Sequence, residues 1–146
     1  MFALRARLLV VTLWVGSLWT VGYLVAPTLF MTLHDRTLAG TIAGSLFHVE
    51  AWLSLVCGLA LVVLIKSTSN ESQHRTVLRV IAGMLVCTLI GYFGFQPFMA
   101  ALRESAGAAG VMASDAKMQF GILHGAASVL YLIESLLGVV LILKLR

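Results

Sequence analysis

The chain has 146 residues, of which 60% are hydrophobic and 11% are charged, and its formal net charge is +4. Its mean hydropathy is +1.01, whereas soluble globular domains contain only about 45 to 50% apolar residues, so this composition excludes an ordinary water-soluble domain. Insertion into a membrane and attraction to anionic lipid headgroups account for the positive charge, so the sequence predicts no nucleic-acid partner.

Four apolar segments are each long enough to cross a membrane as a helix, which takes roughly 20 largely apolar residues. In chain order they cover residues 8–33, 41–65, 80–102 and 119–143. The first and third contain no charged residue and no His. The second contains His48 and Glu50. The fourth contains His124 and Glu134.

The segments between these four runs are short. Short connections make sequential helices antiparallel neighbours. The sequence therefore predicts an all-α fold, an integral membrane four-helix bundle with up-down-up-down topology, formed by residues 1–146 as a single domain.

Basic residues are distributed unequally between the two sides of this predicted bundle. Seven fall on the side of the chain ends and the middle connection, namely Arg5, Arg7, Lys66, Arg75, Arg79, Lys144 and Arg146. Three fall on the other side, namely Arg36, Arg103 and Lys117. Because Lys and Arg in short loops are retained in the cytoplasm, the pattern predicts that both termini are cytoplasmic.

Two prolines lie near the outer side of their segments, Pro27 in the first and Pro97 in the third. Each removes a backbone hydrogen bond and tends to bend its helix. Two bends at one depth would open a cavity toward the outside, and the alternative is that each proline marks a helix end.

Three histidines gather in the outer half of the predicted bundle. They are His34, His48 and His124, and Gln96 belongs to the same layer. His124, Ser128 and Tyr131 recur at helical spacing as one polar stripe. If this stripe faces His48, the two imidazoles form a cofactor site for haem b or copper, with His34 as a further metal ligand. The alternative is that each His bonds a nearby hydroxyl or carbonyl and fixes the packing of its helix.

Two carboxyl groups lie inside the apolar runs, where ionisable side chains are costly and usually functional. Glu50 projects about 200° around the helix from His48 and so points to a different neighbour. Glu134 lies deeper in the fourth segment, beside the polar stripe. We expect either a proton or cation relay or a protonated carboxyl group hydrogen-bonded to a hydroxyl.

Several short stretches carry a family resemblance over most of the chain. They are Leu13-Trp14-Val15-Gly16-Ser17, Ala26-Pro27-Thr28-Leu29-Phe30, Ala39-Gly40, Gly44 to Ala51, and Phe120 to His124. They resemble the bacterial four-span family catalogued as domain of unknown function 4149. That family is similar in turn to the copper resistance protein D group and to haem-binding, protoporphyrinogen-oxidising membrane proteins. The resemblance implies a four-helix bundle in the bacterial inner (plasma) membrane.

The resemblance does not carry every functional residue with it. The haem-binding relatives have a His near the start of the first helix, where this chain has Val11 and Thr12. No Met-rich or Cys-rich run typical of copper binding occurs either.

Three functions follow as hypotheses. The first is a small binding or transport-accessory protein, with the His site or a polar interior that passes a small solute. The second is a haem-dependent redox enzyme, so the sequence leaves open whether the chain is an enzyme. The third is a structural or assembly subunit of a larger membrane complex or homo-oligomer. In all three the helices contact membrane lipids.

Overall fold

The computed structural model describes residues 2–67, 71–107 and 110–145, and every regular element in those ranges is helical. The first span is continuous from α1 (Phe2–Trp19) through a π-helical turn, η1 (Thr20–Val25), to α2 (Ala26–Thr32). The second is α3 (Arg36–Lys66). The third comprises α4 (Glu71–Thr88), a second π-helical turn η2 (Leu89–Gly94), and α5 (Gln96–Ala106). A short 3-10 helix, η4 (Val111–Ala113), precedes α6 (Lys117–Lys144).

Four of these continuous helices are long and apolar enough to cross a membrane. They comprise Ala3–Thr32, Arg36–Lys66, Arg75–Ala106 and Lys117–Lys144. Large apolar side chains such as Leu9, Val63 and Ile122 are exposed on their outer faces, which suits contact with lipid rather than water. The predicted all-α, four-helix membrane bundle is confirmed.

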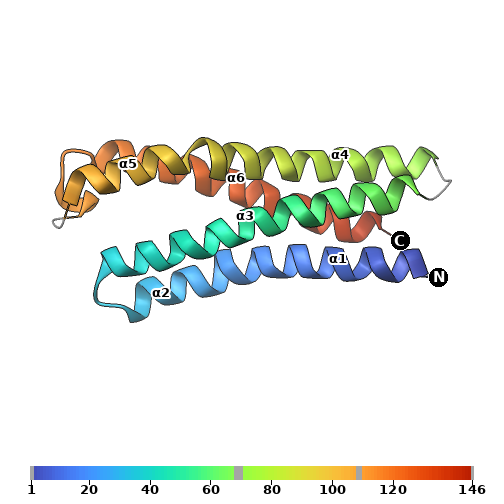
Figure 1. Cartoon of the computed structure of the whole chain (residues 1–146), viewed down its shortest axis with the longest axis horizontal. Coiled ribbons are helices and arrows are strands. Elements are labelled where there is room, and N and C mark those ends of the chain that lie inside the picture. Colours follow the sequence, from blue (N-terminus) through green and yellow to red (C-terminus); the bar gives the residue numbers. More distant parts are fainter. Residues whose placement is uncertain (1, 68–70, 108–109, 146) are drawn as a thin grey trace.

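The helices form a simple ring in chain order (Figure 1). α3 packs against α1 and α4, and α6 packs against α4 and α1, so α3 and α6 lie diagonally opposite each other. The start of α1, the end of α3, the start of α4 and the end of α6 lie at the same end of the bundle (Figure 1). We call this the terminal end, and we call the other, which holds the α2–α3 and α5–α6 connections, the distal end.

The apolar core occupies the half of the bundle toward the terminal end. It contains side chains from all four spans, including Trp14, Leu61, Ile81, Met84 and Leu141, each without solvent exposure. With little hydrophobic drive between helices in lipid, such close packing is a main source of helix association.

The two prolines explain the π-helical turns. Pro27 and Pro97 each stand near the start of the helix that follows such a turn, α2 or α5. Proline has no N–H and its ring clashes with the carbonyl four residues earlier. The backbone before each proline widens accordingly, and Ala26 N–H donates to Val21 and Phe95 N–H to Ile90, both across five residues.

Capping fixes the start of α3 at the distal end. Asp35 Oδ1 accepts hydrogen bonds from the backbone N–H groups of Thr37 at 2.8 Å and Leu38 at 3.0 Å. An aspartate at this position satisfies N–H groups that have no partner within the helix.

Candidate functional site

Two buried carboxyl groups lie near the middle of the bundle, on the diagonally opposite helices α3 and α6. Glu50 is 4% exposed and Glu134 is 3% exposed. The charge of Glu50 acts on Glu134. Burying a charge without a counter-ion is very costly, so the groups around this carboxyl pair determine which protonation states it can hold.

Glu50 meets a hydroxyl on the first span. Ser17 Oγ lies 3.1 Å from Glu50 Oε1, and it also lies 2.9 Å from the backbone carbonyl oxygen of Trp14. The Ser17 hydroxyl therefore has two acceptors within reach, one on a side chain and one on its own helix.

Glu134 meets a hydroxyl on the third span in the same way. Thr88 Oγ1 lies 2.7 Å from Glu134 Oε1 and 3.2 Å from the backbone carbonyl oxygen of Met84. Thr88 is itself buried and is the last residue of α4, directly before η2. The two carboxyl groups thus have equivalent surroundings on opposite sides of the bundle.

A hydroxyl group carries only one proton, so it can donate to only one of its two acceptors at a time. When the hydroxyl donates to the backbone carbonyl, the carboxyl group must be protonated to bond the hydroxyl oxygen. When the carboxyl group is ionised, the hydroxyl turns to donate to it. Ser17 and Thr88 therefore provide a hydrogen bond to their carboxyl groups in both protonation states.

The terminal side of Glu50 is closed by a buried side-chain hydrogen bond. Trp14 Nε1 donates to Ser54 Oγ at 2.9 Å, and both side chains are almost completely buried. Ser54 lies one helical turn after Glu50 on α3. This bond separates the carboxyl pair from the apolar core beneath it.

Tyr131 lies within electrostatic reach of both carboxyl groups. Its hydroxyl donates to the backbone carbonyl oxygen of Leu18 at 2.6 Å, and Gly22 lies beside the same hydroxyl. Leu18 and Gly22 are four residues apart, the spacing of an α-helical hydrogen bond. The phenol thus lies between two backbone groups that would pair in a regular helix, and it supports the π-helical turn η1.

Gly22 allows this approach. A Cβ atom at position 22 would overlap the Tyr131 ring, at 2.8 Å from Cζ and 2.9 Å from the hydroxyl oxygen. The ring also makes edge-to-face contacts with Tyr23 and Phe47, at centroid distances of 6.1 and 5.4 Å. Tyr131 is therefore held in one position beside the carboxyl pair.

Tyr23 connects the buried polar residues around the carboxyl pair to the outside of the bundle. Its hydroxyl donates to the buried Ser135 Oγ at 2.9 Å, and Ser135 follows Glu134 in α6. Tyr23 itself is half exposed. Both π-helical turns therefore border the carboxyl pair: Tyr23 belongs to η1, and Thr88 directly precedes η2. Such turns are frequent at functional sites.

The three histidines lie in different surroundings. His48 is exposed and its Nδ1 lies 2.8 Å from Tyr92 Oη. His124 is exposed and stacks on Phe120, with ring centroids 6.0 Å apart. His34 is exposed in the connection between α2 and α3. Among the described residues, no three His, Cys, Asp or Glu side chains are grouped so as to hold a metal ion.

The reason is the rotation of the helices about their axes. α3 and α6 are diagonal neighbours, and the faces they turn to the interior carry Glu50 and Glu134. The residues expected to form one polar stripe on α6 do not share a face. Ser128 is exposed and donates to the carbonyl of His124 at 2.8 Å, whereas Tyr131 points inward. Gln96 lines a groove together with His48 on the outer side of the bundle.

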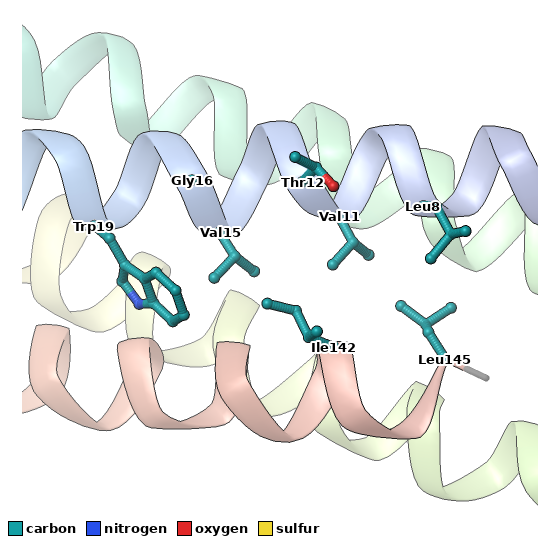
Figure 2. A pocket seen from close by; sticks show the side chains of 8 residues that line it. All are labelled: Leu8, Val11, Thr12, Val15, Gly16, Trp19, Ile142 and Leu145. Carbon is teal, nitrogen blue, oxygen red and sulfur yellow. The ribbon is translucent and has the colours of Figure 1, made fainter.

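A second, apolar groove lies between α1 and α6 toward the terminal end (Figure 2). It measures about 190 Å³, and Val11, Val15 and Ile142 point into it from the two helices. Thr12 is the only hydroxyl-bearing side chain among the eight residues that line this groove. The groove offers apolar contact but no acid, base or metal ligand.

Sequence reasoning found both carboxyl groups and Tyr131 but missed their partners. Ser17, Thr88 and the Trp14–Ser54 pair were not singled out, because isolated Ser and Thr residues are common in membrane helices. A usable signal exists only for Thr88, which is the only Ser or Thr in the third apolar segment, residues 80–102.

The family model described as Domain of unknown function (DUF4149) matches residues 9–108, which cover most of the first span and all of the second and third. No curated protein and no solved structure matches the chain.

Proposed function

Since the chain belongs to the family described as Domain of unknown function (DUF4149), and that description names no activity, we propose a function from the site itself. The protein is a membrane protein that binds and releases a proton at the Glu50–Glu134 pair, as a transport-accessory protein. The observation that carries this proposal is that each buried carboxyl group meets a hydroxyl with a second acceptor.

The surroundings favour a proton over a metal ion as the bound species. No Lys, Arg or His of the described chain is among the groups that act on Glu50 or Glu134, and each feels the other carboxyl group or a hydroxyl instead. Two carboxylates without a cation repel each other and lose hydration. A proton on one of them removes this cost, and the Ser17 and Thr88 hydroxyls turn to suit either state.

Haem b and copper have no part in this proposal. His48 and His124 are exposed and face different neighbours, so these side chains as placed do not fit a shared cofactor. Their role as ligands stays a prediction, which an absorption spectrum and metal analysis of the purified protein would test.

The orientation also belongs to the proposal. We place the terminal end in the cytoplasm and the distal end outside the inner membrane, because seven of the ten basic residues lie on the side of the chain ends. Reporter fusions at the C-terminus and in the α5–α6 connection should report opposite sides of the membrane, with the C-terminus inside.

A hydrophobic carbodiimide tests the proton site directly, because it reacts with protonated carboxyl groups inside membranes. We expect dicyclohexylcarbodiimide to modify Glu50 or Glu134 in the purified protein at neutral pH, as located by mass spectrometry of peptides. The double variant Glu50→Gln and Glu134→Gln should lose this modification. Glu104→Gln, which changes an exposed carboxyl group in α5, should leave it unchanged.

The opposite pattern would refute the proposal. If the reagent modifies only exposed carboxyl groups, or if the double variant is modified to the same extent as the unaltered chain, the buried pair holds no proton under these conditions.

A further inference from the structure

A polar groove lies on the outer side of the bundle between α3 and the third span, near the distal end. It measures about 430 Å³. Its polar lining residues are Thr41, Ser45, His48, Tyr92, Gln96 and Arg103. None of them belongs to the carboxyl pair or to its hydroxyl partners, so this groove is a separate feature with its own chemistry.

Arg103 brings a positive charge to the groove, and no ion pair neutralises it within the described part of the chain. The side chain is half-buried, and its guanidinium carbon lies 5.2 Å from the centre of the Phe120 ring. Cationic side chains within membrane spans are normally paired, because an isolated charge there is costly. A negatively charged group from outside the chain would supply this counter-ion.

A second donor converges on the same point of α3. The position that a Cβ atom would take at Gly44 lies 3.6 Å from Gln96 Nε2 and 3.9 Å from Arg103 Nη1. The absence of a side chain at Gly44 leaves room in front of both nitrogen atoms. An amide and a guanidinium that face one space are suited to bind the oxygen atoms of a phosphate group.

His48 and Tyr92 line the groove on its side toward the terminal end. The hydrogen bond of 2.8 Å between His48 Nδ1 and Tyr92 Oη holds the imidazole in place. Directly toward the terminal end, Trp52 and Phe93 pack edge to face at 5.6 Å. The surface thus changes from polar to apolar within one helical turn.

The apolar surface continues from there along the outside of α3. Val49, Trp52, Val56 and Leu59 recur at spacings of three and four residues and are each more than half exposed. They form a continuous stripe toward the terminal end. A ligand that fits both features has an anionic head and a long apolar chain.

We propose that this groove binds the phosphate group of an anionic phospholipid, with one acyl chain along the stripe from Val49 to Leu59. The depth suits this ligand, because Arg103 lies three residues before the end of α5 at Ala106, which is about 4.5 Å along a helix. The site is independent of the proton-binding pair, so each proposal stands or fails alone.

Native mass spectrometry of the full chain in detergent tests this site by titration with lipids of matched acyl chains. Palmitoyl-oleoyl phosphatidylglycerol is the anionic probe and palmitoyl-oleoyl phosphatidylcholine is the zwitterionic one. We expect the anionic lipid to bind about tenfold more tightly, which corresponds to one charge-assisted contact. Arg103→Gln should remove this preference.

Two further variants separate binding from folding. Gly44→Leu fills the groove without changing the charge, and it should weaken binding of phosphatidylglycerol about as much as Arg103→Gln does. Arg36→Gln removes an exposed arginine at the same end of the bundle and should leave binding unchanged. Circular dichroism of each variant should show the helical spectrum of the unaltered chain.

Three results would overturn the proposal. The two lipids could bind equally, Arg103→Gln could bind phosphatidylglycerol as the unaltered chain does, or inorganic phosphate could displace the lipid at a similar concentration. The last result would identify a site for a soluble anion instead of a lipid.

Discussion

The two halves of the bundle are packed differently. Toward the terminal end, large side chains such as Ile81, Met84 and Leu141 fill the space between the helices without exposure. Leu18, next to Ser17, is still fully buried at the level of the carboxyl pair, but beyond it, toward the distal end, the buried apolar residues of the described chain are three alanines together with Met99 and Val111. The terminal half holds the helices together, and the less filled distal half has room for polar groups and irregular backbone.

The carboxyl pair lies at the boundary between these halves. Both π-helical turns begin at this level, next to Thr88 and next to the first-span residues that contact Tyr131. On the terminal side of the pair, regular helices around a tightly packed core give the polar site a rigid support. On the distal side, the backbone is widened by the π-helical turns.

The largest expected effect on stability comes from Met→Ala substitutions, which can be made in both halves of the bundle. Met84→Ala removes a side chain from the core cluster and should lower the free energy of unfolding by about 3 kcal/mol. Met99→Ala, in the distal half, should cost about 1 kcal/mol, because this half contains fewer large buried side chains. Equilibrium unfolding in mixed micelles, followed by circular dichroism, measures both. Equal costs would mean that the halves do not differ in packing.

A smaller effect is expected at the boundary itself. Gly22→Ala places a methyl group against the Tyr131 ring and should destabilise the protein by about 2 kcal/mol. Gly16→Ala is the matched control in the same span, because no atom lies within 4 Å of its added Cβ. The control should stabilise slightly, since alanine favours helix over glycine. The same unfolding assay would disprove the tight approach if both variants behaved alike.

The smallest effect concerns a single hydroxyl group. Tyr131→Phe leaves the Leu18 carbonyl without its side-chain donor and should cost about 1 kcal/mol. Tyr92→Phe removes the hydrogen bond to the exposed His48 and should cost less than about 0.5 kcal/mol, because lipid headgroups or water replace it there. A Tyr131→Phe variant as stable as the unaltered chain would show that the phenol does not support the π-turn.

The fold could be predicted from the sequence because span length and apolar content depend only on local residues. Long uninterrupted runs determine a membrane helix, and short connections determine its neighbours. Pro27 and Pro97 also predicted distortions, although not that these would take the form of π-helical turns before each proline. The response of the backbone depends on partners such as Tyr131, which lies far away in sequence.

The site could be predicted only in part, because helical spacing does not show how each helix is rotated about its axis. Glu50 and Glu134 were chosen as interior candidates because a carboxyl group in a span has few alternatives, and the structure buries both. His48 and His124 were expected to face each other at one depth, yet both imidazoles are exposed and each contacts a different aromatic residue. Ser17 and Thr88 gained their role from a neighbouring helix, which no local pattern contains.

Infrared difference spectroscopy in heavy water tests the central claim of a protonated buried carboxyl pair most directly. At neutral pH the unaltered chain should show the carbonyl band of a hydrogen-bonded carboxylic acid, and this band should disappear in the double variant Glu50→Gln and Glu134→Gln. Glu104→Gln should retain it. A spectrum without any carboxylic acid band at neutral pH, or a band that persists in the double variant, would contradict the account.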